Sequence, residues 1–280
     1  MSKDQANLQP GAALARMRAE APLVHNITNY VAMTPSANAL LAIGASPAML
    51  SAKEEVAEFA RIAQALVVNI GTLQPETVAG MALAVEAAME AGKPWVFDPV
   101  AHFATGYRRE TARRLLAMKP TLVRGNASEI LALGGEEGAG RGVDAGDPVA
   151  IAEGAARALA RETGGVIAVS GAVDYVTDGR RAARVRNGHP LMPKVTALGC
   201  SLSAVCGAFL GAGLDPFQGA TVAFAAFGLA GERAAARARG PGSLMVHLLD
   251  ELHLLTPDGL DDGARIEFLS SDTADPERTL

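Results

Sequence analysis

The sequence is poor in cysteine, in aromatic residues and in basic charge, and each shortage excludes a class of protein. Two cysteines among 280 residues exclude a disulfide-stabilised secreted scaffold. Aromatic residues make up 4% of the chain, too few for a surface that stacks nucleic-acid bases. The net charge of −5 lacks the basic field that a nucleic-acid partner requires. We therefore expect no nucleic-acid partner, whereas a small anion held by local dipoles remains compatible with the composition.

Long hydrophobic runs and two common catalytic motifs are also missing. The most apolar stretch, residues 202–231, is interrupted at Asp215 and Pro216, before either half reaches the roughly 20 residues of a membrane-spanning helix. The polar residues 1–9 lack the apolar core of a signal peptide. The sequence contains no G-x-x-x-x-G-K-[ST] motif, which excludes a P-loop NTPase. It also contains no G-x-S-x-G motif, which argues against an esterase. We expect a cytoplasmic protein without a membrane segment.

Short apolar runs alternate with helical segments from residue 22 to residue 169. We expect strands at residues 22–26, 46–50, 65–70, 94–97, 121–123 and 166–169, and helices at residues 11–20, 32–43, 54–62, 75–91, 108–118 and 148–162. These strands are apolar throughout instead of alternating with polar residues. The pattern predicts an α/β fold, with a mostly parallel central sheet and helices on both faces.

The last third of the chain has a different pattern. The Asp178-Gly179 turn between two short apolar runs predicts a hairpin. We expect helices at residues 201–214, at 216–239 with a break, and at 244–255, followed by an edge strand at 265–268. Glycine-rich residues 134–146 are expected to form a surface loop, and residues 270–280 a frayed tail. No linker-like segment divides the chain, which predicts one domain over residues 1–280.

Residues able to bind a ligand gather where the predicted strands end. They are His25, Asn26, Met49, Asn69, Gly71, Asp98, Arg124, Asn126, Glu129 and Ser170. The carboxyl ends of parallel strands meet at one edge of a sheet, where ligands bind in folds of this class. We therefore expect these residues to contribute to a single site.

The turn at residues 194–201 leads into the apolar helix expected from Ser201. A glycine and hydroxyl groups before a helix leave several backbone N–H groups aimed at one point, where they and the helix dipole bind a negative charge, most often a phosphate. Cys200 lies beside Gly199 at the start of this helix, where a thiol becomes more acidic. The pattern indicates phosphoryl transfer. An ordinary strand-to-helix turn is the alternative.

Three charged residues at neighbouring strand ends suit a metal-bound phosphate. Asp98 and Glu129 are oxygen donors of the kind that Mg²⁺ uses together with water and substrate phosphates. Arg124 suits a phosphate or the face of a base. As alternatives, Asp98 caps the turn before Pro99, and Arg124 is a solvated side chain paired with Glu129.

Several further residues have both a functional and a purely structural interpretation. Asn26 suits a heteroatom of a small ligand, or else it forms a local Asx-turn. Met49 suits the wall of an apolar ring pocket, or else it belongs to the core. Asn126 has the type and position of a helix N-cap. Ser170 and Gly171 resemble a nucleotide-contacting turn, or else they form a simple turn.

Taken together, these stretches resemble the hydroxyethylthiazole kinase family, the thiazole-salvage enzymes of the ribokinase-like superfamily. The matching segments are His25-Asn26-Ile27-Thr28-Asn29, Gly44-Ala45-Ser46-Pro47-Ala48-Met49, Asn69-Ile70-Gly71-Thr72, Asp98-Pro99-Val100, Arg124-Gly125-Asn126-Ala127-Ser128-Glu129-Ile130 and Gly199-Cys200, in family order over residues 12–255. The resemblance implies a ribokinase-like fold. It also implies a homotrimer with active sites between subunits, and ATP- and Mg²⁺-dependent phosphorylation of the primary alcohol of 4-methyl-5-(2-hydroxyethyl)thiazole.

The resemblance also implies a role for each site residue. Met49 and the position of Ala197 line the thiazole pocket, Arg124 and Ser170 contact ATP, Asp98 and Glu129 serve Mg²⁺ and phosphate, and Cys200 takes the place of the aspartate base of related sugar kinases. We add Asn26 as a substrate contact. We expect Cys200 to orient the hydroxyl and accept its proton late, while the amides around Gly199 stabilise phosphoryl oxygens.

The chain departs from many members of the family at two positions, and other functions remain compatible with the pattern. Ala197 and Leu198 stand where many members have Gly-Thr, which narrows the backbone freedom of the loop and removes a hydroxyl. The alternatives are another ribokinase-like activity, such as hydroxymethylpyrimidine kinase or NAD(P)H-hydrate dehydratase, and a non-catalytic module that binds thiazole or nucleotide. Acyl transfer by Cys200 would need a nearby histidine base, for which no position stands out.

Overall fold

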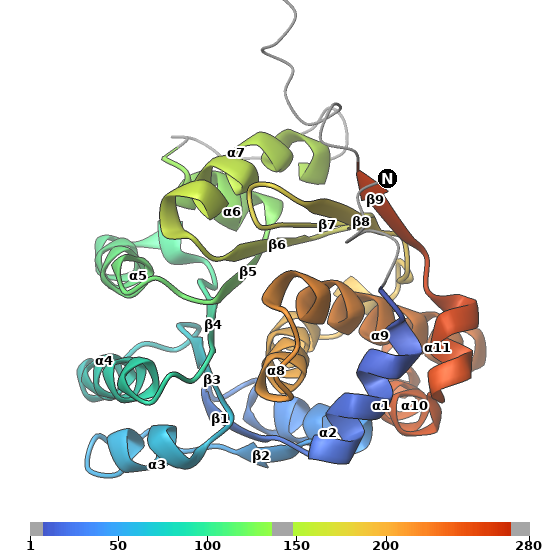
Figure 1. Ribbon diagram of the computed structural model, residues 1–280, viewed down its shortest axis with the longest axis horizontal. Coiled ribbons are helices and arrows are strands. Elements are labelled where there is room, and N and C mark those ends of the chain that lie inside the picture. Colours follow the sequence, from blue (N-terminus) through green and yellow to red (C-terminus); the bar gives the residue numbers. More distant parts are fainter. Residues whose placement is uncertain (1–7, 136–147, 270–280) are drawn as a thin grey trace, which may run out of the picture.

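The computed structural model describes residues 8–135 and 148–269, which form a nine-stranded sheet between two layers of helices (Figure 1). The strands are β1 (Leu23–Ile27), β2 (Ser46–Ala48), β3 (Ala65–Asn69), β4 (Trp95–Asp98), β5 (Leu122–Asn126), β6 (Val166–Ser170), β7 (Asp174–Thr177), β8 (Ala182–Val185) and β9 (Ile266–Leu269). Their order across the sheet is β2-β1-β3-β4-β5-β6-β7-β8-β9. Strands β2 to β6 pair in parallel and β6 to β9 antiparallel, which confirms the mostly parallel sheet and the hairpin.

The helices occupy the expected places between the strands. They are α1 (Pro10–Glu20), α2 (Met33–Ile43), α3 (Val56–Ile62), α4 (Pro75–Glu90), α5 (Gly106–Ala117), α6 (Ala127–Leu133), α7 (Pro148–Thr163), α8 (Leu198–Gly211), α9 (Pro216–Arg237), α10 (Pro241–Leu254) and α11 (Pro257–Gly263). Helices α3 to α7 cover one face of the sheet, and α1, α2, α8, α9 and α10 cover the other (Figure 1). Helices on both faces are therefore confirmed.

The sheet has a buried core on each face because successive side chains of a strand point to opposite sides. Val67 and Val96 pack with the layer that contains α8, whereas Val68 and Phe97 pack with the layer that contains α4. All four are almost completely buried, and burial of each such side chain contributes about 1.5–3 kcal/mol. This two-sided burial explains why the strands are apolar throughout.

Three elements differ from the expectation. Helix α8 begins at Leu198 and not at Ser201, because Ala197 adopts a left-handed conformation with φ of 66° and turns the chain into the helix. Helix α9 runs without the expected break, and α11 had no clear signal. Most of the loop expected at residues 134–146, and all of the tail expected at 270–280, lie outside the described residues. Within the described residues, no helix is long and apolar enough to cross a bilayer.

Candidate active site

The start of α8 lies at the carboxyl edge of the sheet with its first amides free. Ala197 is the N-cap residue, and it has no side chain that accepts a hydrogen bond from the helix. Within the described residues, the N–H groups of Leu198, Gly199 and Cys200 have no hydrogen-bond partner. The positive end of the helix dipole adds to these donors. The start of α8 is therefore prepared to bind an anion.

The side chain of Arg124 lies against this helix start and needs the glycine at position 199. A Cβ atom on Gly199 would lie 2.6 Å from Arg124 Nη1, which is closer than a Cβ atom normally approaches a nitrogen. Arg124 Nη2 donates to Ser170 Oγ at 2.5 Å, and its Nη1 lies 3.9 Å from Asp98 Oδ2. The predicted neighbours Arg124, Ser170 and Gly199 thus meet, and the ion pair of Arg124 is with Asp98 and not with Glu129.

Asp98 is fully buried behind the thiol and the guanidinium. Its Oδ2 accepts hydrogen bonds from Asn69 Nδ2 at 2.8 Å and from Ser203 Oγ at 2.8 Å. Its Oδ1 has no partner among the described residues. Burial raises the pKa of Asp98 to about 6, although the positive charge of Arg124 opposes the shift. Asp98 is therefore a carboxylate held in place by amide and hydroxyl donors, with one oxygen uncommitted.

Two asparagine amides hold the sulfur of Cys200. Asn69 Nδ2 and Asn29 Nδ2 donate to Sγ at 3.2 and 3.4 Å, and Asn29 Nδ2 also donates to Asn69 Oδ1 at 2.8 Å. Burial, reinforced by the charge of Asp98, raises the pKa of Cys200 to about 11. The prediction of a more acidic thiol is wrong, because burial and the charge of Asp98 together raise the pKa of Cys200 more than Asn29, Arg124 and Asn69 lower it. At neutral pH Cys200 is a thiol.

Glu129 and Asn126 cap the start of α6 reciprocally. Asn126 Oδ1 accepts from the N–H of Glu129 at 2.9 Å, and Glu129 Oε2 accepts from the N–H of Asn126 at 2.8 Å. The other carboxylate oxygen of Glu129 accepts from the N–H of Ala101 at 2.9 Å. The N-cap interpretation of Asn126 is confirmed. Each oxygen of Glu129 retains a second lone pair for a ligand.

The oxygen atoms available here suit Mg²⁺ better than a metal ion whose ligands all come from the protein. Within the described residues, no group of three or more His, Cys, Asp or Glu side chains is placed to hold a metal ion. Mg²⁺ needs only one or two carboxylates, because water and substrate phosphates complete its octahedron. The unpartnered Asp98 Oδ1 and the nearby Glu129, whose charge raises the pKa of Asp98, offer two such carboxylates.

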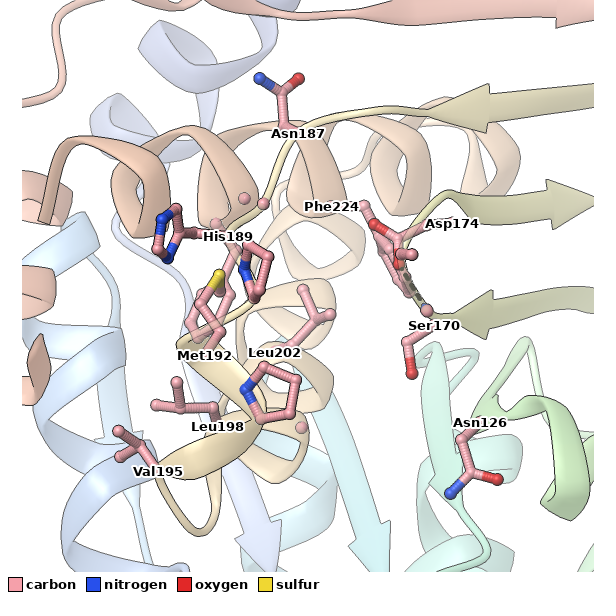
Figure 2. A pocket seen from close by; sticks show the side chains of 18 of the residues that line it. Asn126, Ser170, Asp174, Asn187, His189, Met192, Val195, Leu198, Leu202 and Phe224 are labelled. Carbon is pink, nitrogen blue, oxygen red and sulfur yellow. Dashed lines mark hydrogen bonds between the residues drawn. The ribbon is translucent and has the colours of Figure 1, made fainter. Parts of the chain in front are cut away.

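A cavity of about 590 Å³ lies beside the first turn of α8, with Leu198 and Leu202 on one side and Ser170 and Asp174 on the other (Figure 2). The predicted site residues Arg124, Ser170, Ala197 and Gly199 line this cavity. Its walls are largely apolar, with Leu202 and Phe224 among them. A cavity of this size and lining is typical of a site for a nucleotide-sized molecule.

Asn26 and Met49 line a second, much smaller cavity. Asn26 Nδ2 donates to the carbonyl of Val24 at 2.9 Å, whereas its buried Oδ1 has no partner among the described residues. Met49 is half-buried at the rim. The structure therefore places the predicted thiazole contacts in two cavities, with Ala197 in the larger one and Asn26 and Met49 in the smaller.

Sequence reasoning did not assign a role to several residues that build the site. Asn69 is predicted only as a strand-end residue, and Asn29 only as part of a segment that carries the family resemblance. Ser203 lies three residues after Cys200, a spacing that places both on one side of a helix, and this signal was available in the sequence. Arg108 was missed entirely. It donates to the carbonyls of Ile70, Gly71 and Val100, and so ties two strand-end loops together.

Known proteins resemble the chain in sequence and in structure. A family model described as the hydroxyethylthiazole kinase family matches residues 14–258. A hydroxyethylthiazole kinase of Cereibacter sphaeroides is 60% identical over 257 residues, which cover 92% of this chain and 98% of that protein. A protein of the same name from Rhizobium leguminosarum is 57% identical over 263 residues, which cover 94% and 98%.

Solved structures agree with the sequence matches. The structure of the hydroxyethylthiazole kinase protein from Pyrococcus horikoshii matches with a TM-score of 0.86 and 42% identity, covering 93% of this chain and 99% of that one. A Staphylococcus aureus pyridoxal kinase in complex with ADP matches with a TM-score of 0.56 at 17% identity, over 73% of this chain and 85% of its own, and shows the shared fold. The ribokinase-like fold is therefore confirmed, and the chain belongs to the hydroxyethylthiazole kinase family.

Proposed function

We propose that the protein transfers the γ-phosphoryl group of ATP to the primary alcohol of 4-methyl-5-(2-hydroxyethyl)thiazole. One observation carries the proposal. The free amides at the start of α8, the guanidinium of Arg124 and the thiol of Cys200 converge beside a cavity of about 590 Å³. Donors for a phosphate and a group that contacts an alcohol are thus adjacent, as phosphoryl transfer requires.

Arg124, Ser170 and the α8 amides act on the phosphates. Transferred phosphoryl groups carry charge on three oxygens, and donors placed beforehand stabilise this charge more than water does. Arg124 is held toward the helix start by Ser170 and Asp98. The loss of one such donor lowers the rate by about 100- to 1,000-fold in other enzymes.

Asp98 and Glu129 are the residues that we propose for holding Mg²⁺. When bound, the ion would neutralise charge on the phosphate oxygens. Two groups are available to bind the ion. Asp98 Oδ1 has no partner within the described residues, and each carboxylate oxygen of Glu129 has a lone pair that no hydrogen bond uses. Asn69 and Ser203 hold the other Asp98 oxygen and so fix the direction of the carboxylate.

Cys200 orients the alcohol as a neutral thiol. A pKa of about 11 leaves almost no thiolate at neutral pH, so the resting thiol does not serve as the base that we expected from the sequence. The loose transition state of phosphoryl transfer demands little base strength, because the alcohol loses its proton late, after the bond to phosphorus has largely formed, and the proton can pass to an oxygen of the transferred phosphoryl group. Asn29 and Asn69 hold the sulfur where the hydroxyl must lie.

The small cavity supplies the thiazole contacts that we propose for Asn26 and Met49, with Ala197 between thiazole and phosphate. We propose a homotrimer with active sites between subunits, as the family resemblance implies. The exposed apolar side chain of Tyr30, which lines this cavity, and that of Val31 beside it in sequence suit a subunit interface. Light scattering of the purified protein tests this assembly. We further propose one domain over residues 1–280 and a cytoplasmic location.

A coupled assay of ADP release tests the function. We expect Mg²⁺-dependent turnover with the thiazole alcohol, with the product identified as its phosphate ester by mass spectrometry. Hydroxymethylpyrimidine and hydrated NADH serve as competing substrates. Faster turnover of either competitor would assign another ribokinase-like activity. Binding of the thiazole without any turnover would identify a non-catalytic module.

A further inference from the structure

Most polar side chains along the large cavity are already committed to the protein itself. Asn187 uses both ends of its amide internally, donating to Glu232 Oε1 at 3.2 Å and accepting from the N–H of Arg265 at 2.7 Å. Figure 2 shows its side chain pointing away from the cavity. His189 Nδ1 accepts from the N–H of Leu191 at 3.2 Å. These residues shape the cavity without offering it a strong acceptor.

Asp174 is different, because it brings a buried carboxylate into the cavity wall with one oxygen to spare. It is the first residue of β7 and is 8% exposed. Its Oδ1 accepts from the N–H of Gly171 at 2.9 Å, and its Oδ2 has no hydrogen-bond partner among the described residues. Burial raises the pKa of Asp174 to about 7, as expected for a carboxylate without enough donors to replace water.

The surroundings of Asp174 restrict what it binds. A carboxylate repels phosphate, so the triphosphate belongs at Arg124 and Gly199, where the charge is positive. Figure 2 shows Asp174 on the same side of the cavity as Ser170, and Phe224 contributes to the apolar wall of this cavity, which suits a base. The part of a nucleotide between phosphates and base is the ribose. Its hydroxyl groups are donors that a free carboxylate oxygen accepts.

We propose that Asp174 accepts a hydrogen bond from a ribose hydroxyl of the bound nucleotide through Oδ2, and that it thereby selects ribonucleotides over deoxyribonucleotides. The inference rests on the proposed function and identifies how the same site recognises the sugar. An acidic side chain on a ribose hydroxyl is also the solution used by dinucleotide-binding folds. Loss of a hydrogen bond to the ionised form of this carboxylate weakens binding by roughly tenfold or more.

Calorimetric titration with ATP, 2′-deoxy-ATP and 3′-deoxy-ATP, without the alcohol, tests the proposal. We expect the unmodified protein to bind ATP about tenfold more tightly than at least one deoxy analogue. Asp174→Asn keeps an oxygen for Gly171 N–H and replaces the other by an amide nitrogen. In this variant the affinities for ATP and for that analogue should differ by no more than about twofold. Asp215→Asn, at the exposed N-cap of α9, is the matched control and should keep the preference.

Three outcomes would overturn the proposal. Equal affinity of the unmodified protein for all three nucleotides shows that no ribose hydroxyl is recognised. Equal weakening of ATP and both analogues by Asp174→Asn shows that the side chain only supports the turn at Gly171. A sugar preference that survives in Asp174→Asn, while discrimination of ATP from purine riboside triphosphate is lost, places Asp174 at the base. Because binding is measured, a failure of thiazole phosphorylation leaves these results interpretable.

Discussion

Two helices, α6 and α8, begin at the candidate site, and their first turns are built in opposite ways. At α6 the side chains of Asn126 and Glu129 satisfy the backbone donors in a reciprocal capping box. At α8 the N-cap is Ala197, which offers no side-chain acceptor, and the following amides stay free within the described residues. One helix start uses its donors for its own stability, whereas the other keeps them for a ligand.

This difference assigns separate tasks to the two helix starts. The cap of α6 fixes the carboxylate of Glu129, a group suited to a cation. The uncapped start of α8 concentrates donors on an anion and leaves room for Arg124. A substitution at α8 should therefore act mainly on activity, and one at α6 on stability as well.

The largest effect is expected from Gly199→Ala. Its Cβ would lie 2.6 Å from Arg124 Nη1, so the guanidinium must shift from its position against the helix start. We expect kcat/KM to fall by about 100-fold or more, with little change in the midpoint of urea unfolding. Gly106→Ala is the matched control, since no atom lies within 4 Å of the Cβ it would add. An equal loss of activity in both variants would contradict the prediction that the position of Arg124 beside the α8 amides determines activity.

A second prediction concerns the buried carboxylate of Asp98. Burial raises the pKa of Asp98 from 3.8 to about 6, so the folded protein binds this proton more tightly than the unfolded chain. Protonation of Asp98 therefore adds to the free energy of unfolding. This contribution is complete below pH 3.8 and is lost as pH rises through 6. Asp98→Asn should remove this contribution, worth up to about 3 kcal/mol.

Urea unfolding of both proteins between pH 4 and pH 7 measures the effect. The free energy of unfolding of Asp98→Asn, relative to the unmodified protein, should rise across this interval. An unchanged difference would show that Asp98 titrates normally in the folded protein. Kinase activity of this variant should be low at every pH, because the amide lacks the charge that we propose for Mg²⁺.

A smaller effect is expected from Asn126→Ala. Loss of the cap should lower the free energy of unfolding by about 1 kcal/mol, because the N–H of Glu129 loses its acceptor, Asn126 Oδ1. It should also lower activity, because the first turn of α6, which carries the Glu129 carboxylate, is then held less firmly. Thr105→Ala removes the comparable cap of α5, where Thr105 Oγ1 accepts from the N–H of Arg108 at 3.3 Å. We expect Thr105→Ala to destabilise without a selective loss of kcat. Equal kinetic effects in both variants would argue against a role for Glu129.

The sequence was sufficient to predict most of the fold and the composition of the site, for physical reasons. Uniformly apolar strands specify a covered parallel sheet, and polar residues at their ends then meet at one edge. Asp98, Arg124 and Cys200 were expected together, and the structure brings them together. The capping box was visible as Asn126 followed three residues later by Glu129.

Properties that depend on solvation and exact placement were not predictable in this way. The helix-start argument predicted an acidic Cys200, but the burial that raises its pKa arises only when α8 packs over β3 and β4. Asn29 lies in the loop after β1 and Asn69 ends β3, and no local sequence pattern indicates that both amides reach one sulfur. The division of the predicted thiazole contacts between two cavities likewise depends on tertiary packing.

The smallest effect is expected from Ala197→Gly, which tests the backbone that keeps α8 uncapped. Ala197 has φ of 66°, a left-handed conformation that costs an alanine roughly 1–2 kcal/mol and a glycine little. The greater freedom of glycine in the unfolded chain offsets part of this gain, so we expect a net stabilisation of about 0.5 kcal/mol in urea unfolding. Ala212→Gly, at the other end of α8 with φ of −76°, should instead destabilise. Because the two variants make the same substitution on the same helix, destabilisation by both would show that Ala197 is not left-handed in solution, and the free amides of α8 would then need another explanation.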